Sequence, residues 1–183
     1  MSTGVQIVLL VIAVIVLVLV IRGVRAYFRY QGKRLVTCPE NEKPAAVKVD
    51  AIHAAGRATV SAPELRLSEC SRWPERAGCG QMCLKQIETA PEDCLVKNIV
   101  TKWYEGKNCV FCGKPIHEVE WMGHKPALAT PDRKTVSWDS ISPERLPEVF
   151  ETYAPVCWSC HVDATLLREH PDMVTIRPAK WRE

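Results

Sequence analysis

Two short cysteine motifs decide the fold of this chain, CVFCGKPI at residues 109–116 and VCWSCH at residues 156–161. Each motif contains a C-x-x-C pair, and the two pairs together supply four thiolate ligands. This number and spacing are typical of a tetrahedral zinc site, in which each pair closes a tight turn along one edge of the tetrahedron. Gly113 follows the first pair and permits the positive φ that such a turn requires. The sequence therefore predicts a Zn²⁺ site whose ligands are Cys109, Cys112, Cys157 and Cys160.

The segments around these motifs have the patterns of short strands and helices. The sequence predicts strands at residues 119–121 and 135–138, a short helix over 142–150, and a helix over 162–170 directly after the second pair. This order of knuckle, hairpin and knuckle at the start of a helix resembles a treble-clef zinc finger, and the resemblance covers residues 109–170. In that family the second pair lies at a helix N-terminus, where backbone amides and the helix dipole favour thiolate.

The same arrangement is similar to the HNH endonucleases, some of which carry cysteine pairs around a ββα core. In those enzymes a histidine, often within an Asp-His pair, activates water. The resemblance implies that His124 in MGHKP is the candidate catalytic residue and that His161 falls near a metal-binding position. However, Gly123 stands where the family has Asp, and residues 109–183 contain no Asn. These departures favour a metal-supported scaffold over a nuclease.

A long apolar run dominates the N-terminus. Between Val5 and Ile21, 16 of 17 residues are Val, Ile, Leu or Ala, and the flanking residues extend the run to the length of a bilayer-spanning helix. Tyr27, Phe28 and Tyr30 stand where an interfacial aromatic belt belongs. The alternative is a cleaved signal peptide, but no basic residue precedes the run and no small-residue cleavage site follows it. We therefore predict a single transmembrane anchor that is not cleaved.

The distribution of charge predicts the orientation of this anchor. Basic residues follow the apolar run at five positions, Arg22, Arg25, Arg29, Lys33 and Arg34. By the positive-inside rule, the body of the protein faces the cytoplasm, which places a bacterial-type chain at the inner membrane.

The charge of the body itself bears on its partners. The formal net charge of +3 belongs to residues 1–30, and the remainder carries 21 residues of each sign. A neutral body is a poor electrostatic partner for nucleic acid. The expected partners are therefore the lipid bilayer and another protein at the membrane.

The chain contains nine cysteines, an odd number that argues against a fully paired disulfide framework. In the cytoplasm, metal binding is the better interpretation of so many thiols. Four cysteines of the first half are candidates for a second site that binds either a second Zn²⁺ or an iron–sulfur cluster. They are Cys38, Cys70, Cys79 and Cys83. The alternative is that several of them are ordinary buried small residues, as we expect for Cys94.

The motif CWSCH also matches the attachment sequence of c-type haem, in which the two thiols form thioethers and His161 is the axial ligand. That attachment takes place outside the cytoplasm, so the predicted topology opposes it. The partner pair CVFCG offers a better use for these thiols, and haem stays a minor alternative.

The expected fold class is α+β. An anchor and basic juxtamembrane segment occupy residues 1–30, a cysteine-rich helical module 31–106, and a treble-clef zinc module 107–183. No phosphate-binding loop, nucleophile elbow or paired-carboxylate signature is present. The preferred function is therefore that of a membrane-anchored zinc-binding accessory or scaffold protein. The alternatives are an iron–sulfur electron-transfer subunit and a degenerate HNH-type nuclease.

Overall fold

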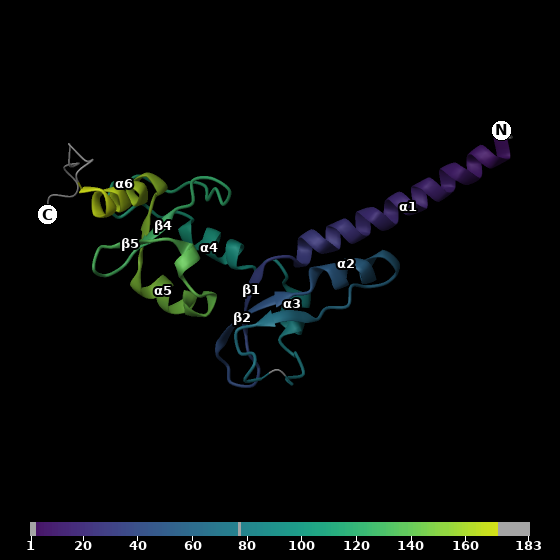
Figure 1. Ribbon diagram of the computed structural model, residues 1–183, viewed down its shortest axis with the longest axis horizontal. Coiled ribbons are helices and arrows are strands. Elements are labelled where there is room, and N and C mark those ends of the chain that lie inside the picture. The colour runs from purple at the N-terminus through teal and green to yellow at the C-terminus, as the bar shows by residue number, and fades with distance from the viewer. Residues whose placement is uncertain (1–2, 77, 172–183) are drawn as a thin grey trace. The chain divides into compact units, whose positions relative to one another are not determined.

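The computed structural model describes residues 3–76 and 78–171. The chain divides into two compact units, Met1–Val96 and Lys97–Glu183. Each unit contains a three-stranded antiparallel sheet together with helices (Figure 1). The protein is therefore a mixed helix-and-sheet chain with an apolar N-terminal helix, in agreement with the fold class that the sequence predicts.

The first unit has the sheet order β1-β2-β3. Its elements are α1 (Thr3–Tyr30), β1 (Lys33–Thr37), β2 (Pro44–Val49), α2 (Ala51–Val60), β3 (Leu67–Cys70) and α3 (Leu84–Thr89). The central strand β2 follows from simple alternation, because Ala45, Val47 and Val49 are buried whereas Lys48 is exposed. Asp50 then caps α2 by accepting a hydrogen bond of 3.0 Å from the backbone N–H of His53.

The last third of α1 packs against α2 in the first unit. Leu19 and Gly23 are half-buried, and Ala26 and Tyr30 are buried. Their spacing of four, three and four residues puts them on one face of the helix. The facing side of α2 is built from small residues, Ala51, Ala54 and Ala58. These alanines, together with Gly23 and Ala26 on α1, let the two backbones approach closely, and the end of α1 lies beside α2 (Figure 1).

The first part of α1 has a different environment. Its large apolar side chains are exposed from Val5 to Val18, and the whole helix of 28 residues is long and apolar enough to cross a membrane. At about 1.5 Å per residue, such a helix extends for about 42 Å, which exceeds the thickness of a bilayer core.

The side chain of Arg34 ties the end of α1 to the segment before α4. Arg34 is fully buried, and its guanidinium donates to the carbonyl oxygens of Arg29 and Pro91. Burial lowers the pKa of Arg34, although the nearby Glu92 carboxylate opposes this effect. Arg34 therefore serves the core of the first unit, and it is not part of an exposed basic patch.

The second unit has the sheet order β5-β4-β6. Its elements are α4 (Val96–Tyr104), which begins at the boundary, β4 (Ala127–Ala129), β5 (Thr135–Val136), η1 (Trp138–Ser140), η2 (Pro143–Arg145), α5 (Leu146–Thr152), β6 (Ala154–Val156) and α6 (Trp158–Glu169). Tyr104 joins helix and sheet, because its hydroxyl donates to the carbonyl oxygen of Ala127 at 2.6 Å and accepts from Trp138 Nε1 at 3.0 Å. Burial raises the pKa of Tyr104.

One predicted strand is wrong. Residues 119–121 form no strand in the described structure, and a turn begins at Trp121. The pairing position is taken by β4, whose three residues are all buried and which pairs with β5 on one side and β6 on the other. Residues 119–121 alternate between apolar and polar, so as a strand they would bury less apolar surface than β4, whose three residues are all buried.

Gly23 is expected to tolerate no large side chain, because α1 and α2 meet there. A Cβ atom at Gly23 would lie 3.3 Å from Thr59 Cγ2 and 3.5 Å from the carbonyl oxygen of Ala55. We expect Gly23→Leu to destabilise the first unit by on the order of 1–3 kcal/mol, seen as a lower Tm of the protein in detergent.

Gly56 on α2 provides the matched control, because a Cβ atom there would meet nothing within 4 Å. Since Ala is favoured over Gly in a helix by about 1 kcal/mol, Gly56→Ala is expected to raise the Tm. Equal shifts in the same direction for both variants would contradict the close helix contact.

Candidate metal centre

Four cysteine sulfurs converge in the second unit. The ligand atoms of this group all lie within 4.8 Å of one another, and its members are Cys109, Cys112, Cys157 and Cys160. The Sγ atoms of Cys112 and Cys157, which come from different motifs, are 3.7 Å apart. A Zn–S bond of about 2.3 Å puts the sulfurs of a tetrahedral site about 3.8 Å apart. The spacing therefore fits a single metal ion held by four thiolates.

The first pair is positioned by a tight turn. The backbone N–H of Cys109 donates to the carbonyl oxygen of Lys114 at 2.9 Å, and that of Gly113 donates to the carbonyl oxygen of Cys109 at 2.8 Å. Gly113 has a φ of 71°, which confirms the positive φ predicted for this position and explains why a residue without a Cβ atom stands there.

The second pair lies at the start of α6. Cys157 is the N-cap residue, and the backbone N–H of His161 donates to its carbonyl oxygen at 3.0 Å. Cys160 is buried within the first turn of the helix. The positive end of the helix dipole therefore lies beside these two thiols and offsets part of the cost that burial imposes on their ionised form.

One backbone hydrogen bond connects the two pairs. The N–H of Val110, inside the first turn, donates to the carbonyl oxygen of Pro155 at 2.9 Å. Pro155 belongs to β6, the strand that leads directly into Cys157. The sheet therefore carries the second pair to the first, and this link had no signal in the sequence because it joins residues that are far apart in the chain.

The thiols differ in how readily they ionise. Burial opposes ionisation of Cys109, but backbone N–H groups donate to its sulfur, and the net effect lowers its pKa to about 7. The donors belong to Cys157, Cys112 and Phe111. Burial raises the pKa of Cys157 and lowers that of His161. Cys109 therefore ionises more readily than Cys157 in the metal-free chain.

The structure places His124 near the rim of the second pair and not on a strand. It lies three residues before β4, with its imidazole 69% exposed and its Nδ1 3.2 Å from the Glu120 carboxylate. Its ring contacts that of Trp158 at a centroid distance of 5.8 Å. An HNH-type role for His124 stays a prediction that this geometry does not test.

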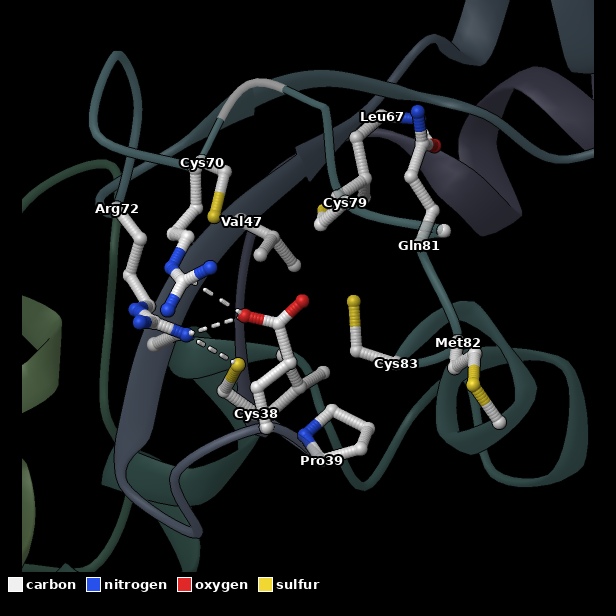
Figure 2. Close-up of a pocket in the computed structure, with 15 residues that line it drawn as sticks. Cys38, Pro39, Val47, Leu67, Cys70, Arg72, Cys79, Gln81, Met82 and Cys83 are labelled. Atoms are coloured by element: carbon white, nitrogen blue, oxygen red, sulfur yellow. Dashed lines mark hydrogen bonds and ion pairs between the residues drawn. The ribbon is translucent and has the colours of Figure 1, made fainter.

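The first-unit cysteines that the sequence singled out also come together. Cys38, Cys70, Cys79 and Cys83 line one cavity, which Arg72 and Glu40 also line (Figure 2). Sequence reasoning missed these two charged residues. Arg72 had a weak signal, since it stands two residues after Cys70 in CSRWPER. No disulfide joins cysteines among the described residues.

Comparisons with protein-family models, curated proteins and solved structures find no match to this chain. The fold and the site define its class: a mixed helix-and-sheet protein with four cysteines in position to bind a metal ion and an N-terminal helix long and apolar enough to span a membrane.

Removing one sulfur from the four-cysteine group is expected to remove both the metal and the fold of the second unit. Because the binding free energy of a structural metal is also folding free energy, Cys112→Ser is expected to cost on the order of 10 kcal/mol in the presence of metal. Zinc content per chain and a thermal melt measure the two effects.

The control is Cys94→Ser. Cys94 is half-buried in the first unit, and its thiol donates only a long bond of 3.8 Å to the carbonyl oxygen of Gln86. We expect this variant to bind metal as the unchanged protein does and to lose little stability. The opposite ranking of the two variants would overturn this assignment of the cysteines.

The metal affinity is expected to fall as the pH falls, because protons compete with the ion for the thiolates. In the metal-free chain the Cys109 pKa of about 7 lies below the value of about 8.5 for an unfolded cysteine. The Cys109 thiolate therefore stabilises the folded chain above about pH 8.5, and this contribution is lost as the pH falls through about 7.

A chromogenic chelator measures this dependence by competing for zinc between about pH 8 and about pH 5. Below about pH 7 we expect the affinity to drop on the order of tenfold or more per pH unit. The Cys94→Ser variant should follow the same curve as the unchanged protein. An affinity that stays constant over this range would argue against thiolate ligands.

Proposed function

We propose that this chain is a membrane-anchored zinc protein whose cytoplasm-facing body acts as an accessory or scaffold subunit for another protein at the membrane. The observation that carries the proposal is the convergence of four sulfurs within 4.8 Å in the second unit. Four protein thiolates complete the coordination of a zinc ion, which leaves no open position for water or substrate. Such a closed site supports a structural role for the metal.

The local architecture supports zinc in particular. The first pair forms a knuckle with Gly113, a β4–β5 hairpin follows, and the second pair begins α6. This order resembles a treble-clef zinc finger. The sulfur spacing suits one small tetrahedral ion, and thiolates are ligands that zinc prefers.

The packing of α1 supports an anchor that is retained. A core helix of a soluble protein would bury its most apolar stretch, but the most apolar 18 residues of α1 are not buried. A signal peptide is cleaved at a small-residue site shortly after the apolar run, and the sequence has no such site there. Any cleavage after Ala26 would also strip that residue from the core of the first unit. The helix is therefore better explained as a span whose end is part of the folded body.

The orientation rests on the basic residues that follow the span. Arg22 donates to the carbonyl oxygen of Ser61 at 3.3 Å at the outer end of α2. Arg25, Arg29 and Lys33 follow it. With Arg34 buried, these four residues supply the positive charge that favours a cytoplasmic body.

The proposal predicts where each part of the chain is found. A reporter fused to the C-terminus is expected to stay protected from protease added outside sealed spheroplasts, and the full chain should need detergent for extraction. A fragment that begins at Arg22 should be soluble and carry zinc, because it keeps the Gly23–Tyr30 face that packs on α2.

A fragment that begins at Gln31 is the matched comparison. It lacks the apolar run as well, but it also lacks Ala26 and Tyr30 from the core. We expect it to be less stable than the longer fragment by several kcal/mol, since Tyr30 alone is a large buried side chain. Digestion of the reporter from outside would refute the orientation, and equal stability would refute the retained-helix argument.

A further inference from the structure

The first unit contains a cavity that four cysteines face from separate segments. Cys38 follows β1, Cys70 ends β3, and Cys79 and Cys83 lie on the segment before α3. The cavity has a volume of about 70 Å³, and Figure 2 shows the four side chains arranged around a common space. The remaining walls are mostly apolar, with Val36, Ala45, Val47 and Leu67 among them.

Two glutamine side chains hold the cysteine-bearing segment against the sheet. Gln81 accepts a hydrogen bond of 2.9 Å from the backbone N–H of Leu67 on β3. Gln86 exchanges two hydrogen bonds with the backbone of Thr37, of 3.0 and 2.6 Å, at the end of β1. The segment is therefore held at both ends, by Gln81 to the first residue of β3 and through Gln86 on the following helix α3 to Thr37, the residue before Cys38.

The spacing of these sulfurs differs from that of the second-unit site. Among the described residues, one group of four sulfurs lies within 4.8 Å of one another, that of Cys109, Cys112, Cys157 and Cys160. The first-unit sulfurs line the cavity and do not form such a group. One zinc ion would draw four sulfurs to about 3.8 Å from one another. In an iron–sulfur cluster the four thiolates bind to different iron atoms of the cluster, so they can lie farther apart.

Cationic side chains line the cavity. Arg72 Nη1 lies 2.8 Å from Cys38 Sγ and 3.5 Å from the Glu40 carboxylate. Arg76 contacts the same carboxylate at 3.7 Å. A cluster with four thiolate ligands carries net negative charge in a mostly apolar pocket, and such a charge needs a nearby partner. Glu40 offsets one of the two arginines, which leaves one net positive charge beside the cavity. Arg72 also donates a hydrogen bond to the sulfur of Cys38.

We propose that this cavity binds an iron–sulfur cluster whose ligands are Cys38, Cys70, Cys79 and Cys83. Four cysteines suffice for a cluster of either the two-iron or the four-iron type. The site is independent of the zinc site in the second unit, so the inference extends the proposed function and does not require it. Because Arg72 donates to a ligand sulfur, it is expected to tune the reduction potential of the cluster.

The test uses the full chain, purified in detergent without oxygen and reconstituted with ferrous iron and sulfide. Iron, acid-labile sulfide and zinc are measured per chain, together with the visible absorption spectrum. We expect iron and sulfide in equal amounts, a visible absorption band that bleaches with dithionite, and a separate complement of zinc.

Variants assign the ligands. Cys70→Ser and Cys83→Ser are expected to lose most of the iron, sulfide and visible absorption while they keep zinc, and the retained zinc shows that the second unit is folded. Cys94→Ser is the matched control, since Cys94 lies in the same unit but does not line the cavity, and it should keep the cluster. Cys112→Ser should lose zinc and keep iron.

Three results would overturn the proposal. The first is an unchanged protein that binds no iron and sulfide after reconstitution. The second is additional zinc that Cys83→Ser removes, which would make this a second zinc site. The third is a cluster that survives in both Cys70→Ser and Cys83→Ser. If the protein binds the cluster but no zinc, the proposed function is refuted and this inference stands.

Discussion

Four thiolates can share the small space of the second-unit site only when a cation offsets their mutual repulsion. Three features of the surrounding structure hold the four cysteines in that space. The Gly113 turn presents one pair, the start of α6 presents the other, and the Val110–Pro155 hydrogen bond brings the two together. A metal ion bound there would add its binding free energy to the stability that the small core of this unit provides.

The first unit is built around the end of its apolar helix. Ala26 and Tyr30 belong to the same core as the sheet residues Val36 and Val47, and only two residues separate α1 from β1. The buried Arg34 stabilises this junction, because its guanidinium donates to the carbonyl oxygens of Arg29 and Pro91. A span that continues into a core in this way would hold the first unit close to the bilayer, without a linker between them.

The two cysteine groups differ in the spacing of their sulfurs. In the second unit the sulfurs close on a volume suited to one ion. In the first unit they line an open cavity together with Arg72 and Glu40. Both groups draw their cysteines from segments far apart in sequence, but only the second-unit group has C-x-x-C turns, which bring two sulfurs together locally.

Features that depend on near neighbours were determined by the sequence itself. The knuckle with Gly113, the helix that starts at the second cysteine pair and the apolar N-terminal helix follow from residue types at short spacing. Burial of Ala26 and Arg34 was not predictable, because α2 and Pro91 contact them from distant positions in the chain. The three residues at 119–121 have the alternation of a strand, yet β4 takes the pairing position. Only long-range packing decides such competitions, since it sets which segment buries more apolar surface and completes its backbone hydrogen bonds.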